Sequence, residues 1–255
     1  MDYAIVGYGR MGRAIDEQAA RRGHRKLVTV DPRARGRKVR RRLAAAALDG
    51  VEVAFEFTAA DQARSNVQAI AAAGVGAVSG TTGWATDRAL ARTFEEAGAG
   101  AVIAPNFSVG MTLFYRVVRE AARRFGALDL HQAYVTEHHH AGKVDAPSGT
   151  ALRLGEIVRR AAPRRPRIVT GPLDAALPDG SVHVTAVRAG FEPGTHRVGF
   201  DGEFDVVELR HSARSRPGFA LGAVLAAEWL IETGSTGVHG FETVLDELVR
   251  AGGRR

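Results

Sequence analysis

The chain has 255 residues, of which 45% are hydrophobic and 25% charged, and it contains no cysteine. This length and composition predict a globular protein with one large domain or two smaller ones, and the lack of cysteine excludes disulfides, thiolate metal sites and a cysteine nucleophile. No apolar run reaches the length of about 18 residues that a transmembrane helix needs, and a strand pattern begins at once. We therefore expect a cytoplasmic protein without a membrane segment.

The formal net charge is +7, and the densest basic segment is residues 35–42. A basic excess is typical of nucleic-acid-binding proteins. This segment has no interleaved aromatic residues, however, and the chain has neither helix-turn-helix nor zinc-finger spacing. We expect no nucleic-acid partner. Lysine is rare beside arginine, so Lys143, inside a histidine-rich segment, indicates that a compact ammonium is favoured there.

The first predicted elements are a strand over 3–6 and a helix over 14–20. The turn between them contains Gly7, Tyr8, Gly9, Arg10, Met11 and Gly12. This is the GxGxxG pattern in its strand–turn–helix setting, where the glycines permit a tight turn, backbone approach to a pyrophosphate and helix packing. It predicts a dinucleotide at the helix N-terminus. The alternative is a glycine turn in an α/β protein that binds no nucleotide.

A second predicted strand, over 27–30, ends at Asp31. An acidic residue at this separation from the glycines typically binds the adenosine ribose hydroxyls, which favours NAD. Arg33, Arg35 and Arg37 follow closely enough to bind the ribose phosphate of NADP instead. The sequence leaves the choice between the two cofactors open.

The alternation continues with strands over 51–58, 77–79 and 101–104 and helices over 61–73 and 87–97. Short connections between alternating elements predict a parallel sheet wound on both faces, which binds ligands at the carboxyl ends of its strands. Three predicted strand ends carry polar or turn residues: Thr58, the Gly80-Thr81-Thr82-Gly83 turn, and Pro105-Asn106-Phe107. Together they predict a nicotinamide pocket.

The pattern changes near residue 128. Strand-like segments over 130–137, 181–189, 196–200 and 204–212, with one helix after Thr150, predict a mostly antiparallel sheet with a helix packed on it. A last apolar helix over 222–231 is expected to return to the first domain. The predicted fold is α/β, a Rossmann-like doubly wound parallel sheet plus a second α+β domain. The first domain comprises residues 1–106 with 217–255, and the second, residues 107–216, serves substrate binding and oligomerisation.

Residues 137–150 combine proton donors, a cation and a helix start. Ser148, Gly149 and Thr150 lie where a helix exposes unpaired N–H groups that can hold a small carboxylate. The plainer alternative is a capping residue beside a solvated histidine loop. Consecutive histidines on an extended chain point to alternate sides, so His138, His139 and His140 are a poor ligand set for one ion, and we expect no metal.

With these motifs the chain closely resembles the dihydrodipicolinate reductases, also called 4-hydroxy-tetrahydrodipicolinate reductases, of the diaminopimelate route to lysine. The resemblance runs nearly end to end. It rests on the glycine turn, on Phe57-Thr58, on residues 80–83 and 104–110, and above all on residues 137–150, with further matches at 188–190, 194–196 and 211–216. The histidine-to-threonine segment is specific to the family, whereas many dehydrogenases share the glycine turn.

The resemblance implies reduction of a cyclic imine dicarboxylate by NADH or NADPH, in a homotetramer built through the sheet of the second domain. It makes His139 the general acid and Lys143 the second catalytic residue. His140 becomes a substrate contact, and Ser148, Gly149 and Thr150 bind a substrate carboxylate. For the cofactor, it assigns Gly7, Arg10, Met11 and Gly12 to the pyrophosphate and Gly80, Thr82, Ala104 and Phe107 to the nicotinamide.

Two departures from the family pattern leave alternatives open. Many members carry a longer GxxGxxG turn, and Ala141-Gly142 replaces residues that are usually bulkier and polar. A related reductase that acts on a different cyclic imine therefore stays an alternative. The arginine excess supports a second one, a nucleotide-binding regulatory protein without catalytic activity.

Overall fold

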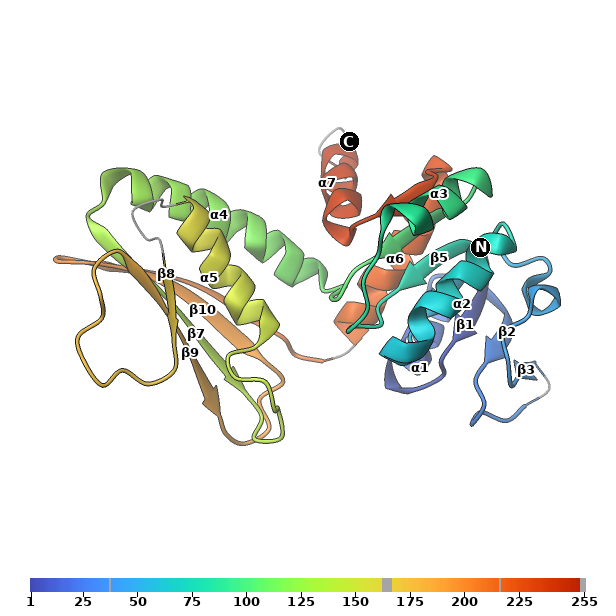
Figure 1. Cartoon of the computed structure of the whole chain (residues 1–255), viewed down its shortest axis with the longest axis horizontal. Helices are drawn as coiled ribbons and strands as arrows, with labels where there is room; N and C mark the ends of the chain where they lie inside the picture. Colours follow the sequence, from blue (N-terminus) through green and yellow to red (C-terminus); the bar gives the residue numbers. More distant parts are fainter. Residues whose placement is uncertain (37, 162–166, 216, 253–255) are drawn as a thin grey trace. The chain divides into compact units, whose positions relative to one another are not determined.

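The computed structural model describes residues 1–36, 38–161, 167–215 and 217–252, so Arg37 and Arg216 lie outside the described residues. The chain divides into two compact units (Figure 1). The first unit comprises residues 1–109 and 216–255, and the second comprises residues 110–215. Within the described residues, no helix has the length and apolar character that crossing a membrane requires.

The first unit contains a seven-stranded sheet in which every neighbouring pair is parallel. In spatial order the strands are β12 (Gly237–His239), β6 (Gly100–Ile103), β5 (Gly76–Ser79), β4 (Val53–Glu56), β1 (Asp2–Val6), β2 (Arg25–Val30) and β3 (Val39–Arg40). Because β1 lies at the reversal of strand order, the turn that follows it lies at the position where such sheets bind ligands.

Helices cover both faces of this sheet. One apolar core joins it to α1 (Arg10–Arg21), α6 (Pro217–Thr233) and α7 (Phe241–Gly252). The other core joins it to α2 (Ala60–Ala72), α3 (Arg88–Glu96) and the 3-10 helix η1 (Ala45–Leu48). In β1, Tyr3 and Ile5 enter the first core and Ala4 and Val6 the second, which explains why residues 3–6 are all apolar or aromatic. The predicted doubly wound sheet is confirmed.

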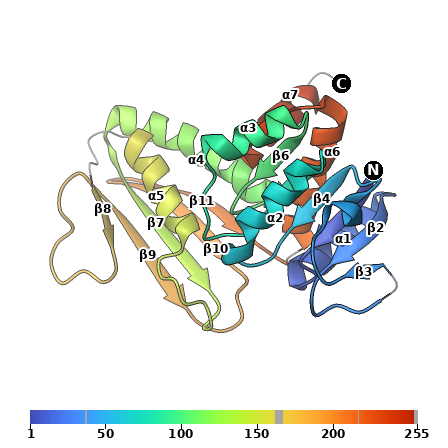
Figure 2. The same ribbon diagram turned by 45° about the vertical axis from the view of Figure 1, so that its right-hand side comes forward.

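The second unit is one sheet with two helices on one face (Figure 2). Its strands, in spatial order, are β11 (Val206–Ser212), β10 (Thr195–Gly202), β7 (His131–His139), β9 (Ser181–Arg188) and β8 (Arg167–Thr170). The helices are α4 (Val109–Leu128) and α5 (Gly149–Ala161). Their apolar side chains form one core with the buried residues of β7, β9 and β10.

This sheet is mixed, whereas the sequence predicts a mostly antiparallel one. The pairs β11–β10 and β10–β7 are antiparallel, but β7–β9 and β9–β8 are parallel. The physical reason is the crossover after β7: α5 carries the chain back along the sheet, so β8 runs in the direction of β7, and the connection over 171–180 carries it back once more before β9. Helix α4 was not predicted either, although Met111, Phe114, Val118 and Ala122 recur at helical spacing and are buried.

Candidate active site

The glycine turn after β1 is shaped by close backbone contacts. Gly7 has φ +94°, and a Cβ there would lie 2.3 Å from the carbonyl oxygen of Phe57. A Cβ on Gly12 would lie 2.2 Å from the carbonyl oxygen of Gly7, whereas one on Gly9 would meet nothing within 4 Å. Gly7 and Gly12 are therefore needed for packing, and Gly9 leaves the backbone open to a ligand. Arg10 begins α1 and is exposed.

Asp31 follows β2 and anchors this turn. Its carboxylate accepts hydrogen bonds from the backbone amides of Tyr8 at 2.8 Å, Arg33 at 2.7 Å and Ala34 at 3.2 Å. Partial burial raises the pKa of Asp31, but the amides of Arg33, Tyr8 and Ala34 outweigh it and hold the pKa below its usual range. Asp31 is thus an anion at neutral pH. The Arg33 side chain is exposed.

Three of the predicted nicotinamide residues lie at the carboxyl ends of β4 and β5. The amide of Thr58 donates a 2.9 Å hydrogen bond to Oγ1 of Thr81, which ties the two strand ends together. A Cβ on Gly80 would lie 2.1 Å from the Phe57 ring, so this position also requires glycine. Thr82 is exposed.

The other predicted nicotinamide residues follow β6, and both are buried. Ala104 is 8% exposed and Phe107 only 2%. The Phe107 ring packs between Phe57 and Phe241, with ring centroids 6.0 and 5.0 Å away. Met11, from the glycine turn, packs against the same core. The Phe107 side chain is therefore a core residue.

Glu56 is a buried carboxylate at this edge that was not among the predicted site residues. It has no exposed surface and accepts a 2.6 Å hydrogen bond from Oγ of Ser79 and another from the hydroxyl of Thr58. Glu56 thereby joins the ends of β4 and β5. The detectable signal was an acidic residue inside an otherwise apolar strand.

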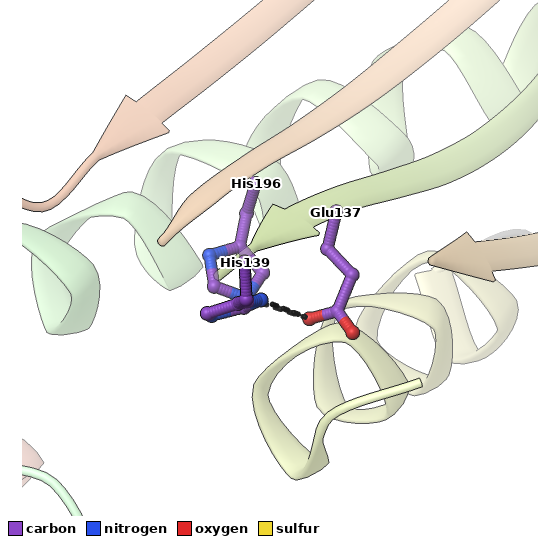
Figure 3. A group of neighbouring side chains, drawn as sticks. All are labelled: Glu137, His139 and His196. Atoms are coloured by element: carbon purple, nitrogen blue, oxygen red, sulfur yellow. Dashed lines mark ion pairs between the residues drawn. The ribbon is translucent and has the colours of Figure 1, made fainter. Parts of the chain in front are cut away.

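In the second unit, β7 places Glu137 and His139 together on the buried face. Residues two apart on a strand share a face, and Ala133, Val135, Glu137 and His139 are all buried while His138 is partly exposed. Figure 3 shows the Glu137 carboxylate beside the imidazole of His139, with His196 of β10 next to both. The His139 and His196 rings meet edge to face, with centroids 5.1 Å apart.

Glu137 is the centre of this cluster. Its Oε1 accepts hydrogen bonds from the Ser148 amide at 2.7 Å and from Nη2 of Arg188 at 2.6 Å. Its Oε2 accepts the hydroxyl of Ser148 and lies 3.3 Å from Nδ1 of His139 and 3.2 Å from Nε2 of His196. Burial raises the pKa of Glu137, but these donors outweigh it and hold the pKa far below its usual range.

His139 is neutral at pH 7 in this structure. Burial lowers its pKa to about 4, because the Glu137 carboxylate, which favours the imidazolium, only partly opposes the desolvation. The contact with Glu137 has ion-pair distance without hydrogen-bond geometry, and Nδ1 has no other polar partner among the described residues. A bound anion near this imidazole would raise its pKa.

The loop after β7 carries two more predicted residues. The amide of His140 donates a 2.8 Å hydrogen bond to the carbonyl oxygen of Glu192, which fixes the start of the loop. The ammonium of Lys143 is 2.6 Å from the carboxylate of Asp145. Asp145 is largely exposed, so Lys143 has a partner that a substrate carboxylate could replace at small cost.

Ser148 differs from Gly149 and Thr150 in what it can offer an anion. Its hydroxyl caps α5 by accepting a 3.2 Å hydrogen bond from the amide of Ala151, and both of its own donors go to Glu137. Gly149 and Thr150 begin the helix, where amides have no intrahelical acceptor. Gly149 is exposed, and a Cβ there would meet nothing within 4 Å. The open amides of this predicted carboxylate site therefore belong to Gly149 and Thr150.

Glu137, His139 and His196 also have ligand atoms within 4.8 Å of one another, a spacing at which a metal ion can be held. The set differs from the three consecutive histidines considered from the sequence. The guanidinium of Arg188, 2.6 Å from the same carboxylate, already supplies a positive charge there and repels a divalent cation. The residues present fit an ion-pair cluster better than a metal centre.

The fold and these sites define a class: two-domain oxidoreductases that bind a nicotinamide nucleotide on a Rossmann-like sheet. Residues 1–107 match the family model described as dihydrodipicolinate reductase, N-terminus, and residues 110–245 match the one described as dihydrodipicolinate reductase, C-terminus. The chain belongs to the dihydrodipicolinate reductase family, as the sequence motifs predict.

Individual relatives agree with this assignment. A 4-hydroxy-tetrahydrodipicolinate reductase of Christiangramia forsetii is 32% identical over 98% of this chain and 100% of the relative. One from Anaeromyxobacter dehalogenans is 41% identical over 73% of this chain and 70% of its own length. The solved structure of a dipicolinate-bound dihydrodipicolinate reductase from Paenisporosarcina sp. TG-14 has the same fold, with a TM-score of 0.78, 23% identity and coverage of 95% of this chain and 98% of that one.

Proposed function

We propose that this protein reduces a cyclic imine dicarboxylate, dihydrodipicolinate or its hydrated form 4-hydroxy-tetrahydrodipicolinate, to tetrahydrodipicolinate in lysine biosynthesis via diaminopimelate. The observation that carries the proposal is the match of both halves of the chain to the two models of one reductase family. The buried Glu137 and His139 pair, beside a helix start with open amides, supports the chemistry.

The first unit would hold NADH or NADPH, which supplies the hydride when bound. The open backbone at Gly9 and the N-terminus of α1 fit a pyrophosphate. The proposed contacts are Gly7, Gly9, Arg10, Met11 and Gly12 for the pyrophosphate, Asp31 and Arg33 for the adenosine ribose, and Thr58, Gly80, Thr82, Ala104 and Phe107 for the nicotinamide. Since the Phe107 ring is buried, Phe107 would contribute through its backbone.

His139 would supply the proton that the reduced ring needs. Reduction places negative charge on the ring nitrogen, and a positioned general acid is typically worth about 10²–10⁴ in rate. A substrate dianion beside His139 raises the pKa of the imidazole from its low value of about 4. The imidazole therefore gains its proton when substrate is bound.

Lys143, His140 and the start of α5 would hold the substrate carboxylates. The Lys143 ammonium exchanges the exposed Asp145 for a substrate carboxylate, and the Gly149 and Thr150 amides fix a carboxylate at the helix N-terminus. Because the donors of Ser148 are bonded to Glu137, Ser148 would act by shaping the helix start rather than by binding the anion directly.

The second unit would also assemble the protein into a homotetramer. Its helices cover one face of the five-stranded sheet, and Tyr134, Val187 and Val206 lie on the other. Exposed apolar side chains on a sheet face are typical of subunit interfaces. Val187→Asp is expected to reduce the mass measured by light scattering, and a mass unchanged from a monomeric wild type would contradict the assembly. The arginine-rich surface gives no reason to add a nucleic-acid partner.

A coupled assay tests the reaction. The substrate is generated from pyruvate and aspartate semialdehyde by the preceding synthase, and nicotinamide absorbance is followed with each nucleotide. We expect consumption that depends on this protein, and a loss of about 10²-fold or more in His139→Gln. His138→Gln, one residue away on the opposite face of β7, is the matched control and should keep its activity.

Two outcomes would overturn the proposal. One is no consumption of either nucleotide by a folded protein that binds NADH. The other is a faster reaction with a cyclic imine that carries a single carboxylate, which would favour the related reductase suggested by Ala141-Gly142.

A further inference from the structure

Glu137 is buried far more completely than its position beside a solvent-facing loop requires. Its side chain has no exposed surface, and burial of a carboxylate is costly unless several donors satisfy it. Ser148 and Arg188 satisfy Oε1 fully, and the hydroxyl of Ser148 takes one lone pair of Oε2. One lone pair of Oε2 remains, and two imidazole nitrogens, Nδ1 of His139 and Nε2 of His196, lie near it.

The imidazole of His139 is constrained on both edges. Its Nδ1 lies 3.3 Å from Oε2 of Glu137, and a Cβ on Gly194 would lie 2.7 Å from its Nε2. An anionic oxygen beside Nδ1 favours the tautomer with the proton on Nδ1. A second proton, acquired with substrate, must then be carried on Nε2, the nitrogen that is left to donate.

We propose that Glu137 is a positioning residue for His139: its carboxylate holds a proton on Nδ1, so that Nε2 is the atom that gives the catalytic proton. This inference rests on the proposed function in one respect, the role of His139 as the acid. The carboxylate is itself held by Arg188 and Ser148, so the imidazole is tied to β9 and to the start of α5. Catalytic contacts of this kind often shorten when substrate binds.

The charges around His139 make Glu137 the decisive group. Among the described residues, the charged groups with the largest effect on the pKa of the imidazole are Glu137 from β7, His196 from β10, Lys143 from the following loop and Arg188 from β9. Only Glu137 favours the imidazolium, and the other three disfavour it. Replacing Glu137 by a neutral residue therefore leaves His139 harder to protonate, and the alkaline limb of the pH–rate profile moves to lower pH.

Glu137→Gln in the full chain tests the inference, with Glu208→Gln on β11 of the same sheet as the matched acid-to-amide control. Nitrogen-15 NMR of labelled histidine in the protein without substrate reads the His139 tautomer. We expect the Nδ1–H tautomer in wild type and in Glu208→Gln, and a loss of this preference in Glu137→Gln. The turnover of Glu137→Gln should fall roughly tenfold or more, with its alkaline limb at lower pH and NADH affinity unchanged. Glu137→Asp keeps the negative charge, so it should recover part of the tautomer preference and part of the turnover.

The NMR readout separates this inference from the proposed function. If wild type reduces the imine but Glu137→Gln keeps the tautomer and the pH limb of wild type, the positioning role is wrong and the reductase remains. If wild type fails in the assay, yet the Nδ1–H tautomer of wild type is lost in Glu137→Gln, the proposed reaction is wrong and the pairing of Glu137 with His139 stands. Should Glu137→Gln not fold, the wild-type spectrum decides alone: an Nδ1–H tautomer of His139 supports the inference, and an Nε2–H tautomer would overturn it.

Discussion

The backbone amide of Tyr8 donates a 2.8 Å hydrogen bond to the carboxylate of Asp31, so the glycine turn and the end of β2 hold each other in place. The same carboxylate also accepts the amides of Arg33 and Ala34. The oxygens of Asp31 organise the turn, and in the proposed cofactor complex its charge would act on the adenosine ribose.

Asp31→Asn should remove the charge of this side chain together with one of its two acceptors. The amide keeps one oxygen, which can serve the Arg33 and Ala34 amides, while the acceptor of the Tyr8 amide is lost. Because the negative charge is gone, repulsion of a ribose phosphate falls by about 1 kcal/mol, which is roughly fivefold in affinity. In titrations followed by nicotinamide fluorescence, the affinity for NADPH relative to that for NADH should rise by that factor. Asp31→Ala, which loses the acceptors as well, should weaken both nucleotides. An unchanged NADPH to NADH ratio in Asp31→Asn would remove Asp31 from the choice of cofactor.

Gly12→Ala and Gly9→Ala should separate packing from ligand approach. A Cβ at position 12 meets the backbone oxygen of Gly7 at 2.2 Å, and such overpacking typically costs about 1–3 kcal/mol of unfolding free energy. A Cβ at position 9 has open space, so urea unfolding should be nearly unchanged. NADH affinity should nevertheless fall, because the added methyl occupies the approach of the pyrophosphate. Equal stability of the two variants would contradict the packing argument.

The stability of the protein should fall between neutral and mildly acidic pH because of His139. Burial lowers its pKa to about 4, while the unfolded chain has the ordinary value of about 6.5. Between these pH values the unfolded state therefore binds a proton that the folded state does not. The contribution of the neutral His139 imidazole to the unfolding free energy is complete above pH about 6.5 and is lost as the pH falls towards 4. Urea unfolding of wild type and His139→Gln between these values should show a flatter profile in the variant, by up to about 3 kcal/mol.

Gly194→Ala should displace the His139 imidazole without replacing any polar side chain. The added methyl would lie 2.7 Å from Nε2, and the residue has φ +152°, a conformation in which alanine is strained. We expect the imidazole to shift and turnover to fall roughly tenfold or more, since small misplacements of reacting groups are costly. Gly190→Ala, at φ +58° with no atom within 4 Å of its Cβ, controls for backbone strain alone. Equal losses in the two variants would mean that strain, not the imidazole, sets the rate.

Much of the first unit follows from local pattern. Its predicted strands over 3–6, 27–30 and 101–104 fall within a few residues of β1, β2 and β6, because the parts of these strands that are buried on both faces are mainly apolar. The short strands β3 and β12 carry little periodic signal and were not predicted. In the second unit the direction of β9 depends on a crossover and not on composition, which is why the mixed sheet could not be predicted.

The sequence by itself determined the family, the alternating fold and the segment around His139, since glycine spacing, strand periodicity and the histidine-to-threonine motif are local properties of the chain. Tertiary structure alone decided the environment of that histidine. Arg188 and His196 come from other strands, and only the pairing of β7 with β9 and β10 brings them to Glu137. A pKa depends on burial and on neighbouring charges, and both are set by residues that are distant in the chain.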